Sequence, residues 1–143
     1  MQFLIKDNSL IDLFITHENK KTTNICNTKF LGITLDNTLN WKTNINMTIP
    51  KLSTVCFAIR RVRPFLSQES LMMVYYSYFR LIMTCGVTFW GNSYYSTNIF
   101  RLQKKTIRII MRIRNRDSCR EHFRKLKILT LQSQYIYYHF HFF

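Results

Sequence analysis

The amino-acid sequence predicts an α+β fold that is mostly α, with a small antiparallel sheet over about residues 1–36 followed by a bundle of four to five helices. Two patterns lead to this prediction. Residues 1–36 contain short runs of Ile, Leu and Phe separated by polar clusters, as in strands joined by hairpin turns. From position 45 onward apolar residues recur every three or four positions, which is the period of a helix that buries one face.

Three apolar runs of ordinary strand length make up the predicted sheet: QFLIK at 2–6, LIDLFIT at 10–16 and KFLGITL at 29–35. The polar clusters KDNS and HENKKTTN predict the turns between them. A sheet of three or four such strands is too small to be stable alone, so a second layer has to cover it. We therefore expect a sheet region over residues 1–40 and a helical unit over residues 41–143.

The helical unit is predicted to begin with two helices. Pro50 lies inside the first, which is therefore either one kinked helix or a short turn followed by a helix from Pro50, and Arg63-Pro64 ends it. Ser67 is expected to cap the second helix and Gly86 to end it. The apolar stripe of the first helix is Ile45, Ile49, Leu52, Cys56 and Ile59. That of the second is Leu71, Val74, Tyr75, Tyr78, Ile82 and Cys85. We interpret its aromatic residues as core rather than as platforms for stacking bases.

A third helix, from Ile99 to about Ile113, carries the clearest chemical signal. At 100° per residue, one side of this helix presents five cations within an arc of about 100°. These cations are Arg101, Lys104, Lys105, Arg108 and Arg112, with no acid between them. Like charges four residues apart repel by about 0.2–0.5 kcal/mol. Such a face therefore costs stability unless an anion covers it. Shorter helices are expected after Ser118 and over the C-terminal residues.

The whole chain is strongly basic, with 21 Lys and Arg against 7 Asp and Glu. Its net charge is +14, and residues 101–127 hold eleven Lys and Arg and two acids, which gives +9. This balance indicates a polyanionic partner. We favour a nucleic-acid backbone, with an ordinary solvated face and an anionic membrane surface as the alternatives. Lys51, Arg60 and Arg61 are further candidates for phosphate contacts.

No pattern of catalytic or metal-binding residues is visible. The acids are scattered, and no catalytic triad or glycine-rich phosphate loop is present, so we predict no catalytic residue, no metal site and no cofactor. Cys119 and His122 are more typical of a helix surface than of a metal site. Four widely spaced cysteines without a CxxC pair are typical of reduced thiols inside the cell. We expect no signal peptide and a location in the nucleus or cytoplasm.

The order of several motifs resembles a known family. FLGITLDNTLNW, then KLS, then RRVRPFLSQESLMMVYYSYFRLIMTCGVTFWG, and then IFRLQKKTIRIIMRIRNRDSCREHFRKLKILTLQSQYIYY resemble the reverse transcriptases of insect-type, jockey-like non-LTR retrotransposons. The resemblance covers nearly the whole chain and is strongest over residues 29–41, 85–91 and 102–137.

The resemblance implies a role for each part of the chain. Residues 1–40 would form the edge of the palm sheet, with Phe30, Leu31 and Gly32 in the hairpin of the primer grip. Residues 41–143 would form a thumb-like helical unit that closes over the template–primer duplex. The family's catalytic Tyr-x-Asp-Asp motif, which holds Mg²⁺ in the full enzyme, is absent from this sequence. We therefore expect a chain without polymerase activity.

These observations predict a fragment of an RNA-directed DNA polymerase that binds the backbone of an RNA–DNA or RNA duplex without reading its bases. No small-molecule substrate and no membrane partner are expected. Two alternatives remain open. The chain is either a remnant or incomplete gene product with no stable activity, or a small basic membrane-associated protein that uses residues 81–100, a run without charges.

Overall fold

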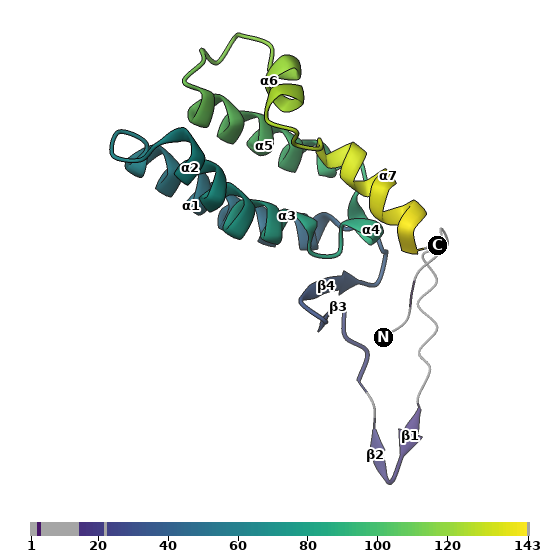
Figure 1. The fold of residues 1–143 in the computed structure, drawn as a ribbon. Coiled ribbons are helices and arrows are strands. Elements are labelled where there is room, and N and C mark those ends of the chain that lie inside the picture. The colour runs from purple at the N-terminus through teal and green to yellow at the C-terminus, as the bar shows by residue number, and fades with distance from the viewer. Residues whose placement is uncertain (1–2, 4–14, 22, 143) are drawn as a thin grey trace.

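The structure, a computed structural model, describes residue 3, residues 15–21 and residues 23–142. Helices dominate it, and two small antiparallel hairpins precede them (Figure 1). The predicted α+β, mostly α class is confirmed. The strands predicted over residues 2–6 and 10–16 lie almost entirely outside the described residues.

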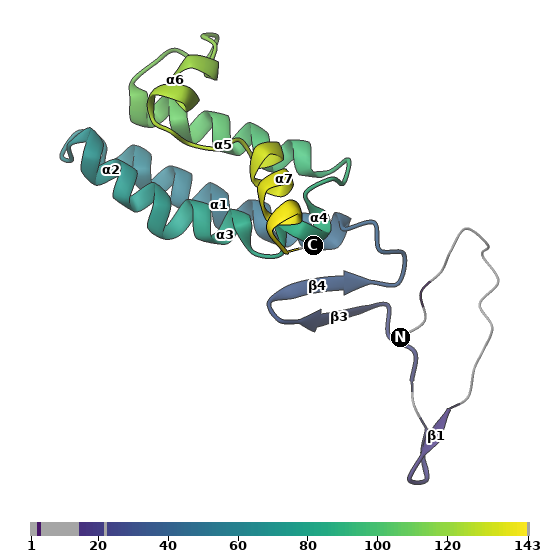
Figure 2. The ribbon, with the colours of Figure 1, turned by 45° about the vertical axis from the view of Figure 1, so that its right-hand side comes forward.

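Each hairpin pairs two short strands. In the first, β1 (Thr16–His17) pairs with β2 (Lys20–Lys21). In the second, β3 (Asn27–Phe30) pairs with β4 (Ile33–Asp36), with Phe30 opposite Ile33. The second hairpin lies next to the helices, and the first extends away from them (Figure 2).

The expectation of a single strand over residues 29–35 was wrong. The chain reverses at Leu31 and Gly32, whose φ angles are 48° and 80°. Positive φ at both central residues is the geometry of a two-residue type I′ turn, whose twist matches that of the paired strands. Gly32 adopts this conformation freely, whereas Leu31 carries a β-carbon that makes it costly.

The helices follow in the predicted order. Their bounds are α1 (Lys42–Val62), α2 (Gln68–Val74), η1 (Tyr75–Arg80), α3 (Leu81–Thr84), α4 (Val87–Trp90), α5 (Ser96–Met111), α6 (Arg120–Lys125) and α7 (Leu131–Phe142).

Pro50 lies within α1, which continues through it as one helix. Pro50 has no backbone N–H, so the carbonyl oxygen of Asn46 lacks its usual donor within the helix. Both residues are exposed, so water can bond to this oxygen. The predicted cap is confirmed, because the hydroxyl of Ser67 accepts a hydrogen bond of 3.3 Å from the N–H of Ser70.

Helices α2, η1 and α3 form one continuous helix with a π-helical middle. The π turn changes which residues face the core, because its i→i+5 hydrogen bonds widen the turn. Buried residues here recur every four positions: Leu71, Tyr75, Phe79 and Met83. Tyr78, predicted for the buried stripe, is instead 60% exposed, and Cys85 is also exposed.

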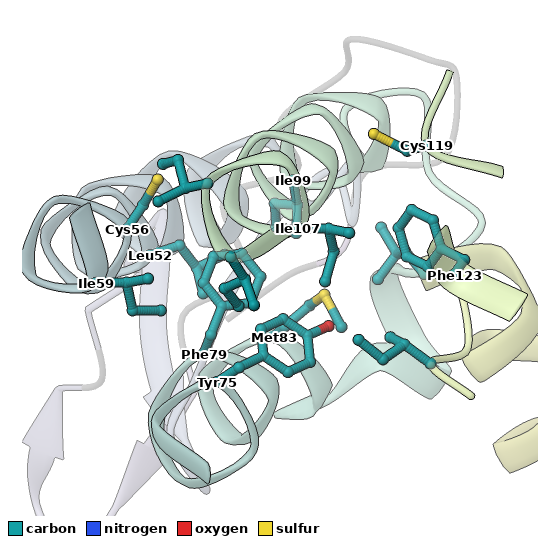
Figure 3. Packing of buried hydrophobic residues seen from close by; sticks show 14 of the residues in the cluster. Leu52, Cys56, Ile59, Tyr75, Phe79, Met83, Ile99, Ile107, Cys119 and Phe123 are labelled. Carbon is teal, nitrogen blue, oxygen red and sulfur yellow. The ribbon is translucent and has the colours of Figure 1, made fainter. Parts of the chain in front are cut away.

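The main core lies between α1, the continuous helix from α2 to α3, and α5 (Figure 3). Ile59 from α1 and Ile107 from α5 lie near the side chains of η1 there, and Cys56 lies on the side of α1 that faces α5. Helices α6 and α7 pack on α5, and Phe123 of α6 is part of the same core. Burial of these apolar side chains at about 25 cal/mol per Å² is the main stabilising contribution.

The second hairpin is fixed to this helical unit at two points. The backbone N–H of Thr34, on the outer edge of β4, donates a hydrogen bond of 3.0 Å to Oδ1 of Asn44 in α1. On the other side Ile33 packs against Gly86, where a β-carbon would overlap the Ile33 side chain. Gly86 has φ 67°, so the glycine that ends α3 also leaves room for the hairpin.

Candidate nucleic-acid interface

Helix α5 is the scaffold of the candidate interface, and its buried side fixes how its basic side is presented. Ile99, Ile109 and Ile110 of α5 are in the core. The buried side also holds two polar residues that the apolar pattern did not reveal, Gln103 and Thr106. The hydroxyl of Thr106 bonds back to the Leu102 carbonyl oxygen at 3.0 Å, so it is satisfied within the helix.

Gln103 joins three segments through its buried side chain. Its Nε2 atom donates to the hydroxyl oxygen of Tyr75 and to the carbonyl oxygen of Leu129, each at 3.0 Å. Its Oε1 atom accepts the backbone N–H of Leu131 at 3.0 Å. Because Leu131 is the first residue of α7, these bonds hold the start of α7 and the helix η1 in place against α5.

The structure places four of the five predicted cations on the solvent side of α5. Arg101 and Lys105 are exposed, and Lys104 and Arg108 are half-buried. The fifth, Arg112, lies one residue beyond the helix, which ends at Met111 and not near Ile113. Arg112 has φ 58°, outside the helical range, so helical spacing does not determine where its side chain lies. It borders a hollow with Gln68 and Leu71 of α2.

The basic side of α5 divides between two neighbouring helices. Lys105 faces α1, where it lines a small hollow together with Arg60. Lys104 and Arg108 face α6 and line a larger cavity of about 750 Å³ between α5, α6 and the start of α7. The sequence pattern treated these residues as one stripe, whereas the packing of α1 and α6 on either side of α5 separates them.

The contacts of these cations are with neutral groups. Nε and Nη2 of Arg108 donate to the carbonyl oxygen of Asp117 at 3.3 and 3.2 Å. The Nζ atom of Lys104 lies 4.7 Å from the centre of the Phe100 ring, a cation–π distance. Nη1 of Arg101 donates to Asn98 at 3.4 Å. Within the described part of the chain, none of the five predicted cations forms a salt bridge.

The three weaker candidates on α1 do not share one surface. Arg60 alone joins the side of α1 that faces α5. Lys51, nine residues earlier, lies about 180° around the helix from it. Arg61 is exposed, and its guanidinium carbon lies 5.9 Å from the Phe57 ring centre. A duplex seated on α5 therefore reaches Arg60 more readily than Lys51 or Arg61.

Phe30, Leu31 and Gly32 lie at the tip of the second hairpin, away from α5. Phe30 and Leu31 are exposed, Leu31 by 82%. A β-carbon on Gly32 would lie 3.8 Å from Sγ of Cys85, so the tip is next to the end of α3. The structure thus brings these three residues together as an apolar hairpin tip and does not join them to the cations of α5.

Sequence reasoning missed three cations that the structure adds to the α5 surface. Arg120 and Arg124 of α6 and Lys127 just after it line the same cavity as Lys104 and Arg108. Their spacing of i, i+4 and i+7 is that of one helical face. This spacing is visible in the sequence CREHFRKLK, residues 119–127, and could have indicated a second basic helical face.

Cys119 begins the α6 segment as a buried thiol. Its Sγ atom donates to the carbonyl oxygen of Lys104 at 3.6 Å. Burial raises the pKa of this thiol, and the nearby charges of Arg108 and Lys104 partly oppose that rise.

The described residues contain no group of three or more His, Cys, Asp or Glu side chains arranged to hold a metal ion. They also contain no helix long and apolar enough to cross a membrane.

Comparison of the chain with protein-family models, with curated proteins and with solved structures finds no match.

Proposed function

We propose that this chain binds the sugar–phosphate backbone of a nucleic-acid duplex, an RNA–DNA hybrid or an RNA duplex, without reading its base sequence. The observation that carries the proposal is the set of α5 cations with no acidic partner among the described residues. Their mutual repulsion is unrelieved within the protein, and a row of phosphates would relieve it.

The position of α5 also suits a backbone contact. Arg60 of α1 flanks the basic side of α5 on one edge, and Arg120 and Arg124 of α6 flank it on the other. The surface is therefore wider than one helix. Lys and Arg side chains that meet phosphates set the position of a duplex but carry no information about its sequence.

The resemblance to reverse transcriptases of jockey-like non-LTR elements supports the same proposal. In that family the corresponding helices form the thumb, which closes over the template–primer duplex. The sequence contains no Tyr-x-Asp-Asp motif. The proposed activity of this chain is consequently binding without nucleotide incorporation.

Filter binding to an RNA–DNA hybrid at low and high salt tests this function. One variant replaces the five cations by glutamine: Arg101, Lys104, Lys105, Arg108 and Arg112. A matched control removes five positive charges elsewhere: Lys20, Lys29, Lys42, Arg63 and Arg80. We expect the first variant to lose most retention at low salt and the control to keep most of it. Equal retention of all three proteins would refute the proposal.

Exposed apolar side chains favour a second candidate, a remnant without an activity of its own. Tyr78, Leu81 and Phe89 are each at least 60% exposed along η1, α3 and α4. Large exposed apolar surfaces promote association. Under this alternative the purified chain aggregates and melts without cooperativity, whereas a monomer with a sharp melting transition would count against it.

A further inference from the structure

The cavity between α5, α6 and α7 has features that duplex-backbone binding does not require. Its volume of about 750 Å³ lies in the range of small-molecule sites, about 300–1,000 Å³. Among the described residues that line it, none is acidic and five are cationic: Lys104, Arg108, Arg120, Arg124 and Lys127. The nearest acids in sequence, Asp117 and Glu121, are exposed and are not part of the lining.

The inner part of the cavity is apolar and aromatic. Phe100 from α5 and Phe123 from α6 both line it, with ring centres 6.4 Å apart and planes inclined by 40°. Ile128 completes this apolar part. Phe123 is only 5% exposed, so the half-buried ring of Phe100 is the surface on which a planar heterocycle can stack, a contact worth about 1–3 kcal/mol for a nucleic-acid base.

The outer part of the cavity presents hydrogen-bond donors for an anion. Arg108 uses two of its five N–H groups on the carbonyl oxygen of Asp117, which leaves three for a ligand. Arg124 and Lys127 are exposed and carry no contact with a carboxylate among the described residues. Thr130 and Ser133 line the cavity at the start of the twelve-residue helix α7, whose N-terminal end is the positive end of its dipole.

We propose that this cavity binds a phosphorylated nucleoside. The base stacks against Phe100, where it takes the place of the Lys104 ammonium, and the phosphates contact Arg124 and Lys127. The cationic rim alone would suit any anion, and the aromatic part alone would suit any apolar molecule. A nucleoside phosphate offers an anionic group to the cationic rim and a planar base to the aromatic part. The same chemistry is presented by a free nucleotide and by the phosphorylated end of a nucleic-acid strand.

Isothermal titration of the full chain tests the ligand class. The ligands are ATP, adenosine, inorganic triphosphate, and a ten-nucleotide oligothymidylate with either a 5′-phosphate or a 5′-hydroxyl. We expect ATP to bind at least tenfold more tightly than adenosine and than inorganic triphosphate. Triphosphate as tight as ATP would overturn the assignment to a nucleotide. Tighter binding of the 5′-phosphorylated strand than of ATP would support the same site with a strand end as the source.

Two variants test the location. Arg124→Gln with Lys127→Gln removes two exposed cations of the rim and should weaken the binding of ATP or of the 5′-phosphorylated strand at least tenfold. The control, Arg114→Gln with Arg116→Gln, removes the same charge from exposed residues outside the lining and should change affinity by less than twofold. Ser133→Trp fills the cavity and should abolish binding while circular dichroism stays unchanged. Equal affinities of the rim variant and its control would overturn the proposal.

The outcome does not depend on duplex binding. Arg101 and Lys105 belong to the proposed duplex surface but do not line this cavity. A variant with both changed to glutamine should bind ATP as the wild type does. Loss of duplex binding with retained ATP binding would therefore contradict neither proposal, whereas loss of ATP binding in this variant would overturn the cavity assignment.

Discussion

Nε2 of Gln103 lies 3.0 Å from the hydroxyl oxygen of Tyr75, and both side chains are completely buried. This hydrogen bond joins α5 to the π-helical segment η1. Through its other two bonds Gln103 also holds Leu129 and the N-terminus of α7. One side chain thus links three segments, and it sets the position of the candidate interface relative to the core.

Replacement of Gln103 by alanine should destabilise the protein strongly. The change leaves the Tyr75 hydroxyl, the Leu129 carbonyl and the Leu131 N–H without their partner, and an unsatisfied buried polar group costs about 1–3 kcal/mol. We expect a loss of about 3 kcal/mol or more in the free energy of unfolding, measured by urea denaturation. Gln68→Ala, at an exposed position, serves as the control and should cost less than about 0.5 kcal/mol. Equal effects would contradict the bridging role of Gln103.

Tyr75 should make stability fall at high pH. Burial raises the pKa of Tyr75 to about 12 from its usual 10.0, and the hydrogen bond from Gln103 only partly opposes this. Between these two values the unfolded chain has lost the proton that the folded protein keeps. The stabilisation is therefore complete below pH 10 and is lost as pH rises through 12, by about 3 kcal/mol in total.

Urea denaturation between pH 9 and 12 measures this effect. The control is Tyr75→Phe, which lacks the ionisable group. We expect the difference in stability between wild type and Tyr75→Phe to change in favour of the variant as the pH rises. Parallel curves for the two proteins would show that Tyr75 does not titrate in this way.

Gly86 should be far less tolerant of alanine than Gly32. Both have positive φ angles, so each substitution strains the backbone by about 1 kcal/mol. At Gly86 the added β-carbon would also overlap the side chain of Ile33, whereas at Gly32 its nearest neighbour is Sγ of Cys85 at 3.8 Å. We expect Gly86→Ala to cost at least 1 kcal/mol more in thermal or urea unfolding. Similar costs would mean that the hairpin does not pack on α3 as described.

Leu31→Asn should stabilise the chain. Leu31 has φ 48° and is 82% exposed at the hairpin turn, where a type I′ turn favours Asn. The leucine therefore adds strain without burying its side chain. We expect a gain of about 0.5–1 kcal/mol in the free energy of unfolding. If the apolar tip also contacts a primer strand, as the resemblance implies, the same variant should bind a hybrid duplex less tightly.

The sequence predicted those parts of the fold that local patterns determine. Ser67 and Gly86 correctly marked helix ends, and the apolar spacing of residues 45–59 identified α1. Tyr78 was placed in the core because the pattern assumed a uniform α-helix, and a π turn depends on packing that spacing does not encode. The buried Gln103 was missed for a similar reason, since its three partners are 26 or more residues away in sequence.

The candidate site was predictable in composition but not in arrangement. Charge and helical period placed Lys104, Lys105 and Arg108 on the outer side of α5. Only the packing of α1 and α6 shows that Lys105 faces one neighbour and that Lys104 and Arg108 face the other. Arg112 follows the helical spacing in sequence, but the helix ends before it.

The salt dependence of duplex binding tests the central proposal most directly. For wild type and for the variant with Arg101, Lys104, Lys105, Arg108 and Arg112 changed to glutamine, the slope of log K against log salt concentration is measured on one RNA–DNA hybrid. Each phosphate contact contributes about −0.9 to this slope on a duplex. Five contacts should therefore make the wild-type slope steeper by about 4.5 than that of the variant, while the charge-matched control stays close to wild type. Identical slopes, or an equal change in the control, would contradict the assignment of the α5 surface.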